Sequence, residues 1–267
     1  MTIQAISYGG GVQSTALLVL AARREIPYDV ALFANVGDDS EHPDSIRYVR
    51  DVARPYAEAH GIRIHELKKT VRNETVTLRE YLTDPDRRSV TIPSYMSGGV
   101  PTGRACTVDF KIRVIQKWLR QNGATKDDPA VTAIGISVDE IERANKNKDL
   151  PKYQRIEYPL LDLGLHRHNC KTVIADAGLE VPPKSSCYFC PYHRPSVWAE
   201  MRRDEPELFA LSADLESLMN QKRARNGQEA VYLTKYGKPI TEAINEAQIT
   251  LFDTSGPDSC DSGYCWT

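Results

Sequence analysis

Residues 7–20 read SYGGGVQSTALLVL, and this stretch carries the strongest information about the fold class. Three consecutive glycines separate a strand-like segment from an apolar, helix-like segment. Because glycine weakens the interior of helices and strands, such a run marks backbone that turns tightly or approaches a ligand closely. The order strand, glycine turn and helix N-terminus places backbone amides and the helix dipole where they can hold an anion.

The composition of the chain narrows its class. With 267 residues, 41% of them hydrophobic, the chain can bury a full core. The formal net charge of −2 gives no overall basic field, although it does not exclude local basic patches. We find no apolar run long enough for a membrane span and no secretory signal pattern, so we expect a cytoplasmic protein with no membrane partner. In that reducing compartment the six cysteines should be metal ligands or reactive thiols rather than disulfides.

Strand-like and helix-like segments alternate along most of the chain. This alternation predicts an α/β fold, a parallel sheet with helices on both faces, followed by a helical C-terminal extension. The segment 83–103 is rich in Pro, Gly and Ser, and we expect it to be functional or mobile. The expected strands are 2–7, 28–34, 63–67 and 131–137, and the expected helices are 13–24, 43–60, 111–121, 166–177 and 196–225.

We divide the chain into three regions. Residues 1–195 form a nucleotide-binding α/β domain with a cysteine site, and residues 196–253 form the helical extension. The end of the last long helix, within 219–225, is basic and suits a nucleic-acid partner. Residues 254–267 have the composition of turns and are expected to be a mobile tail that carries cysteines.

The glycine loop lacks the lysine of GxxxxGK[ST] and the spacing of GxGxxG. The segment 9–14, GGGVQS, resembles instead the pyrophosphatase loop (PP-loop), usually written SGGxDS, of the adenine-nucleotide α-hydrolase superfamily. Reductases of phosphoadenosine phosphosulfate (PAPS) are similar here, including the glutamine. The resemblance implies a Rossmann-like fold whose loop binds ATP with Mg²⁺, with Ser14 donating to the phosphates and Gln13 orienting them. A purely structural turn is the alternative.

The resemblance continues through residues 2–195. FANVG at 33–37 with EHP at 41–43, GISVDE at 135–140 and YPLLD at 158–162 are similar to later family motifs, in order and at plausible spacing. It implies that 33–43 lies near the adenine and ribose and that Arg143 contacts phosphate. The nucleotide-binding residues implied are Ser7, Gly9, Gly10, Gly11, Val12, Gln13, Ser14, Asn35, Gly37, Glu41, Gly135 and Arg143, of which Gln13 and Ser14 are also candidate catalytic residues.

Cys187 and Cys190 form a CxxC pair, which is typical of a metal site, a redox dithiol or inert core thiols. Cys106 lies where cluster-bearing sulfonucleotide reductases carry a Cys-Cys pair. The resemblance to cluster-dependent thiolation enzymes implies that Cys106, Cys187 and Cys190 hold a [4Fe–4S] cluster with one iron open to sulfur. Cys170 is either a fourth ligand or a core thiol. Four thiolates would give a closed site, as in structural zinc (Zn²⁺) or an electron-transfer cluster.

Two further cysteines, Cys260 and Cys265, lie in the tail. A cysteine so near the terminus is similar to the mobile catalytic cysteine of PAPS reductases, so Cys265 is a candidate nucleophile. The pair could instead carry or reduce a persulfide, or have no function.

Three functions of different classes follow. We favour an ATP pyrophosphatase that adenylates an acceptor for sulfur insertion, either a nucleic-acid base, as in tRNA thiolation, or a DNA backbone phosphate, as in phosphorothioation. Its partners would be the nucleic acid and a sulfur donor such as a cysteine desulfurase. The second function is a sulfonucleotide reductase that uses Cys265. The third is an inactive nucleotide-binding module of a larger complex.

Overall fold

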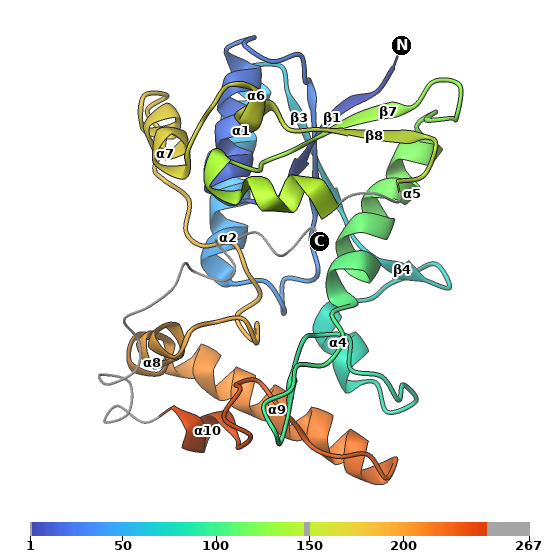
Figure 1. The fold of residues 1–267 in the computed structure, drawn as a ribbon, viewed down its shortest axis with the longest axis vertical. Coiled ribbons are helices and arrows are strands. Elements are labelled where there is room, and N and C mark those ends of the chain that lie inside the picture. The colour runs from blue at the N-terminus through green and yellow to red at the C-terminus, as the bar shows by residue number, and fades with distance from the viewer. Residues whose placement is uncertain (1, 147–149, 245–267) are drawn as a thin grey trace.

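Five parallel strands form the central sheet of the computed structural model, which describes residues 2–146 and 150–244 (Figure 1). Every pairing in this sheet is parallel. The α/β architecture expected from the sequence is therefore confirmed, and the fold is Rossmann-like. The strand order is β3-β2-β1-β7-β8, with β1 Gln4–Tyr8, β2 Val30–Ala34, β3 Arg63–Leu67, β7 Ala130–Ile134 and β8 Gln154–Glu157.

The direction in which strands are added reverses beside β1. From β1 the chain adds β2 and β3 on one side, and it then returns to add β7 and β8 on the other side. In open α/β sheets such a reversal leaves a crevice beyond the carboxyl ends of the two strands at which it occurs, and ligands bind there. In this chain that crevice lies beyond β1 and β7, where the glycine loop begins.

Helices cover both faces of the sheet (Figure 1). Successive side chains of a strand point to opposite faces, so Ile6 of β1 packs in one apolar cluster and Ala5 in another. The cluster around Ile6 includes α1, α3 and α7, whereas the cluster around Ala5 includes α5. The helices concerned are α1 Val12–Ala22, α3 Arg54–Ala59, α5 Arg113–Gln121 and α7 Arg167–Ala175.

A second core lies between the sheet domain and the extension. It combines Leu78 and Ile92 with Phe189 of the CxxC segment and with Trp198 and Met219 of the extension. The strand β6, within the segment 83–103, pairs antiparallel with β9 of the extension. The elements of this layer are α4 Leu78–Thr83, β6 Tyr95–Met96, α8 Pro195–Asp204, α9 Pro206–Arg225, β9 Val231–Tyr232 and α10 Ile240–Ala243.

Most of the expected elements are present, and several differ or were not expected. The expected helix 196–225 is divided into α8 and α9, because Pro206 starts a new helix. The expected helix 43–60 contains a π-helical stretch, and β8 was not expected at all. Within the described residues, no helix has the length and apolar character to cross a membrane. The remaining elements are α2 Pro43–Arg47, the π-helical segments Tyr48–Ala53 and Val108–Ile112, β4 Thr70–Val71, β5 Glu74–Thr75, the 3-10 segment Val138–Lys146 and α6 Pro159–Asp162.

Candidate functional site

The glycine loop turns between β1 and α1 with two of its amides directed at one oxygen atom. Gly10 has φ of +74°, in the left-handed region that favours glycine. The N–H groups of Gly9 and Gly11 both donate to Ser14 Oγ at 3.2 Å, and this hydroxyl donates to the Gly11 carbonyl at 3.1 Å. Converging amides at a helix N-terminus form a concave site that can hold an oxygen of an anion.

Gly135 brings the end of β7 against this loop. A Cβ at position 135 would lie 2.9 Å from the backbone carbon of Gln13 and 2.9 Å from the backbone nitrogen of Ser14. Since real side chains do not approach backbone so closely, glycine is required here. The loops that follow β1 and β7 therefore share one crevice.

Gln13 belongs to a buried polar network that spans three elements. Its Nε2 donates to Glu140 Oε2 at 3.2 Å, and Arg167 donates to its Oε1 at 2.9 Å. Arg143 forms an ion pair of 2.5 Å with the same Glu140 oxygen, and both side chains are buried. In this structure Arg143 thus balances a buried carboxylate, and its contact with phosphate stays a prediction.

The end of β2 supplies a second group of the predicted residues. Asn35 Oδ1 accepts the N–H of Gly37 at 2.8 Å, and its Nδ2 donates to Asp38 at 2.7 Å and to Glu66 at 2.8 Å. Gly37 has φ of +129°, and a Cβ there would lie 2.5 Å from Thr77 Cβ. An aspartate at position 35 could not donate to two carboxylates, which explains why this chain has an asparagine.

The chain that leads into the CxxC pair is held on the glycine loop. The Ser185 hydroxyl donates to the carbonyl of Gly9. Its Cβ also lies 3.5 Å from the position that a Cβ on Gly11 would take. Nothing in the sequence marks Ser185 as part of the site, apart from its place two residues before Cys187.

Backbone hydrogen bonds then fix the CxxC segment along the carboxyl edge of the sheet. The N–H of His42 donates to Ser186 O at 3.0 Å, and the N–H of Tyr188 donates to Ser40 O at 3.3 Å. The loop after β2 and the cysteine segment therefore run side by side, which places the cysteines next to the predicted nucleotide-binding residues.

Glu41 lies in the middle of this pairing. It forms an antiparallel bridge with Cys187, is only 2% exposed, and lies 3.5 Å from Lys111 Nζ. Neither of its carboxylate oxygens has a hydrogen-bond donor among the described residues. Mg²⁺ prefers oxygen ligands of this kind, and the predicted role of Glu41 in binding the nucleotide stays a prediction.

Three of the four predicted ligand cysteines, Cys106, Cys187 and Cys190, are partly buried. The N–H of Cys190 donates to Cys187 O at 3.1 Å in a tight turn. Burial raises the pKa of Tyr192, Arg104 lowers it, and the neighbouring thiols of Cys190 and Cys106 raise it further. Cys106 and Cys187 both pack against the second core, and their sharing of one metal centre stays a prediction.

Cys170 lies in a different environment. It is fully buried on α7 in the cluster around Ile6, whereas Cys106 and Cys187 pack against the second core. Burial raises its pKa to about 11. The structure does not bring Cys170 together with the other three cysteines, and its packing is that of a core thiol.

The thiols are not arranged around a single zinc ion. A tetrahedral zinc site with Zn–S bonds of ~2.3 Å needs sulfur atoms about 3.8 Å apart. Among the described residues, no group of three ligand atoms within 4.8 Å of one another includes a cysteine. Whether Cys106, Cys187 and Cys190 hold a [4Fe–4S] cluster or zinc stays a prediction.

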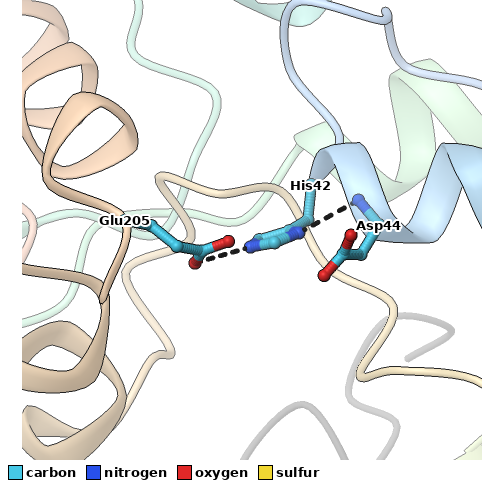
Figure 2. A group of neighbouring side chains, drawn as sticks. All are labelled: His42, Asp44 and Glu205. Carbon is cyan, nitrogen blue, oxygen red and sulfur yellow. Dashed lines mark hydrogen bonds and ion pairs between the residues drawn. The ribbon is translucent and has the colours of Figure 1, made fainter.

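Among the described residues, His42, Asp44 and Glu205 place three potential metal-ligand atoms within 4.8 Å of one another (Figure 2). The sequence did not reveal this group. His42 Nε2 lies 3.1 Å from Glu205 Oε2, and His42 Nδ1 accepts the N–H of Asp44 at 3.3 Å. Both ring nitrogens are therefore in use. Since His42 precedes α2 and Glu205 joins α8 to α9, we interpret the group as a helix cap and a contact between the sheet domain and the extension.

Ser7, Val12 and Cys265 complete the predicted set. The Ser7 hydroxyl, buried near the end of β1, has no hydrogen-bond partner in the described part of the chain. A buried polar group without a partner requires an explanation such as a ligand or water. Val12 begins α1 and packs into the cluster around Ile6. Cys265 and Cys260 lie outside the described residues, so the predicted role of Cys265 stays a prediction.

Comparison with known proteins gives a distant structural similarity. No protein-family model matches the sequence, and a search of curated proteins gives no match. Among solved structures, the chain is similar to the U34-tRNA thiolase NcsA from Methanococcus maripaludis with its [4Fe-4S] cluster. The identity is 17% and the TM-score 0.42, over 82% of this chain and 72% of that chain. Similarity at this level does not assign a function.

Proposed function

We propose that this chain is a PP-loop ATP pyrophosphatase that adenylates an acceptor oxygen and replaces it with sulfur. The observation that carries the proposal is the hydrogen bond from Ser185 to Gly9, which joins the glycine loop to the CxxC segment. A reaction that first activates an oxygen and then exchanges it for sulfur needs a phosphate site and a thiol site at one crevice. Holding the reactants at one crevice makes both steps effectively intramolecular.

In the first step the glycine loop and the N-terminus of α1 hold phosphate oxygens of ATP. The acceptor oxygen attacks the α-phosphorus and a new O–P bond forms. The bond between the α-phosphorus and the oxygen that bridges it to the β-phosphorus breaks, and pyrophosphate is released. The protein contributes position and electrostatic stabilisation rather than a covalent intermediate. Glu41 supplies carboxylate oxygens for the Mg²⁺ that accompanies the nucleotide.

In the second step hydrosulfide attacks the carbon that carries the adenylate. A C–S bond forms, the C–O bond breaks, and AMP leaves with the original oxygen. One ATP and one hydrosulfide thus convert a C=O group to C=S, with AMP and pyrophosphate as the other products. Cys106, Cys187 and Cys190 would ligate an iron–sulfur cluster, which supplies an iron site for sulfide when bound. A donor such as a cysteine desulfurase would deliver the sulfur as a persulfide, and a thiol reductant would release it as hydrosulfide.

The basic helix end gives less support for a nucleic-acid acceptor than the sequence suggested. Lys222 is buried, and its Nζ donates to the Leu82 carbonyl. Arg223 donates to the Glu229 carbonyl, and burial lowers its pKa. These two cations serve the packing of α9, so the nucleic-acid acceptor stays a proposal that the product analysis must test.

Product analysis tests the proposal. The anaerobically purified protein is incubated with Mg²⁺ and ATP, with and without total tRNA or plasmid DNA, and separately with PAPS and a thiol reductant. We expect pyrophosphate and AMP from ATP, stimulated by one of the nucleic acids. Sulfite from PAPS without pyrophosphate from ATP would instead identify a sulfonucleotide reductase. The absence of both products would identify an inactive nucleotide-binding module.

A further inference from the structure

The turn that begins α7 lies against the first turn of α1. Arg167, the first residue of α7, donates to Gln13 Oε1 at 2.9 Å. The N–H of Val138, which starts the 3-10 segment after β7, donates to Leu165 O at 2.9 Å. Residues 165–167 are therefore fixed to the loops that follow β1 and β7, so they border the crevice in which the glycine loop lies.

His166 and Asp139 form a hydrogen-bonded pair at this border. His166 Nδ1 lies 2.9 Å from Asp139 Oδ1. The other carboxylate oxygen of Asp139, Oδ2, accepts the N–H of Arg167 at 2.6 Å and the Ser137 hydroxyl at 3.4 Å. Donors thus hold both oxygens of Asp139, and Asp139 in turn fixes the orientation of the His166 ring.

The pair determines which ring nitrogen of His166 carries hydrogen. Hydrogen bonds from His166 and from the N–H of Arg167 hold the pKa of Asp139 below its usual range, so this side chain is a carboxylate at neutral pH and only accepts. The hydrogen of a neutral His166 ring is therefore on Nδ1, and Nε2 has the free electron pair. In the described part of the chain no hydrogen bond reaches Nε2, and 45% of the His166 side chain is exposed.

A histidine that a carboxylate orients in this way has the arrangement of a general base, whose outer nitrogen takes a proton from a reacting group. The helix α1 brings no ionisable side chain to this corner. Glu140 and Arg143 pair with each other, so Asp139 is the carboxylate that contacts the ring. The ionisable side chains that the adjoining segments bring to this corner are Asp139, Glu140 and Arg143 of the 3-10 segment and Arg167 and His168 of α7.

We propose that His166 Nε2 is the general base of the adenylation step and that Asp139 is its positioning residue. The inference rests on the proposed function and makes it more specific, because the acceptor then carries an N–H group beside the carbonyl whose oxygen is activated. A phosphodiester acceptor has no such hydrogen. Since His166 borders the glycine loop, the base lies on the side of the crevice where the phosphates of ATP are expected.

The proton and the electron pairs balance over the two steps. As the carbonyl oxygen attacks the α-phosphorus, the N–H hydrogen passes to His166 Nε2 as a proton and its electron pair forms a C=N bond. The carbonyl electron pair forms the O–P bond, and pyrophosphate leaves. When hydrosulfide adds to the same carbon, its hydrogen passes to the nitrogen, a C=S bond forms and AMP leaves. His166 releases its proton to water and returns to its starting state.

The pH dependence of acceptor-stimulated pyrophosphate release tests the inference. The assay contains ATP, Mg²⁺ and either total tRNA or plasmid DNA, and ATP affinity is measured in parallel by titration calorimetry. His166→Gln should lower kcat by about 10²–10⁴-fold, the usual contribution of a general base, and should abolish the fall of kcat on the acid side. Its affinity for ATP should equal that of the parent. Asp139→Asn should also lower kcat, because an asparagine amide can donate to Nδ1 and so place the ring hydrogen on Nε2.

His60→Gln, at an exposed histidine that follows α3, is the matched control and should leave kcat and its pH profile unchanged. Hydrogen–nitrogen correlation NMR of the histidine rings in the parent gives a readout that needs neither turnover nor substitution, and it should place the ring hydrogen of His166 on Nδ1. A hydrogen on Nε2, or an unchanged kcat and pH profile in His166→Gln, would overturn the inference while the proposed function stands. The absence of pyrophosphate release from the parent with both nucleic acids would reject the proposed function and the inference together.

Discussion

The Ser185 hydroxyl donates a hydrogen bond to the carbonyl of Gly9, across 176 positions of sequence. Since Cys187 follows two residues after Ser185, this bond places the beginning of the CxxC segment on the glycine loop. Two motifs that are separate in the sequence thus lie at the same edge of the sheet, beyond the carboxyl ends of β1 and β7.

Substitution of Gly135 should disturb the glycine loop without unfolding the sheet. In Gly135→Ala the new Cβ would lie 2.9 Å from backbone atoms of Gln13 and Ser14, so the loop must shift. We expect the affinity for ATP, measured by titration calorimetry, to fall about tenfold or more, which corresponds to ~1.4 kcal/mol. Gly103→Ala is the control, because a Cβ there meets nothing within 4 Å. Equal ATP affinities of the two variants would contradict the close approach of β7 to the loop.

Serine substitutions should separate the three candidate ligands from Cys170. After anaerobic reconstitution, Cys106→Ser, Cys187→Ser and Cys190→Ser should each lose most of the bound iron and acid-labile sulfide. Cys170→Ser should keep both, because Cys170 packs in the apolar cluster of α7. It should nevertheless lower the free energy of unfolding by about 1–3 kcal/mol, because it places a hydroxyl in an apolar cluster. Iron lost from Cys170→Ser but retained in Cys187→Ser would reverse the assignment.

Acid should destabilise the fold through His193. Burial lowers the pKa of His193 to about 3, with a further contribution from Lys184. In the unfolded chain the pKa is about 6.5, so below this pH the unfolded state binds a proton that the folded state excludes. The contribution of His193 to stability is therefore complete above pH 6.5 and is lost as the pH falls toward 3.

Urea denaturation at pH 7 and pH 5 measures this loss. Between these two values His193 should account for about 2 kcal/mol of the fall in the free energy of unfolding. In His193→Gln that part of the fall should be absent. If the parent and the variant lose equal free energy between pH 7 and pH 5, His193 does not have the assigned role.

The contact between His42 and Glu205 should contribute modestly to joining the extension to the sheet domain. The pair is partly exposed, so a double-mutant cycle with His42→Ala and Glu205→Gln should give a coupling of about 0.5 kcal/mol. His42→Ala alone should cost about 1 kcal/mol more than Glu205→Gln, because it also removes the acceptor for the N–H of Asp44. Additive effects of the two substitutions would show that the pair contributes nothing.

The tail cysteine distinguishes the two candidate reactions. If ATP activates the acceptor, Cys265→Ser should leave pyrophosphate release unchanged and at most slow the delivery of sulfur. The assay follows pyrophosphate and sulfur incorporation separately, with Cys187→Ser as the comparison. Abolition of sulfite release from PAPS in Cys265→Ser, with nucleotide binding intact, would favour the sulfonucleotide reductase.

The parts of the fold that were predicted from the sequence have strong local signals. The strand β2 is a continuous apolar run, and β1, β7 and the fully buried helix α1 are mostly apolar. The strand β8 was missed because its sequence QRIE is mostly polar, as an edge strand of the sheet permits.

The contacts that assemble the site depend on tertiary structure and have no local signal. Ser185 is marked by no motif, and only the folded chain shows that it bonds Gly9. Cys170 was grouped with the CxxC pair because it precedes the pair closely in sequence. On α7 its side chain packs in the apolar cluster around Ile6 instead, because packing determines which face of a helix is buried.

Coupling of ATP cleavage to sulfur insertion is tested most directly by analysing the acceptor itself. Nucleic acid is incubated anaerobically with the iron-loaded protein, ATP, Mg²⁺ and hydrosulfide, digested to nucleosides and examined by mass spectrometry. The predicted result is a nucleoside in which sulfur has replaced a base oxygen, formed in equal amount with AMP and pyrophosphate and absent with Cys187→Ser. The contradicting result is ATP left intact and no sulfur in any nucleoside, while the same preparation releases sulfite from PAPS.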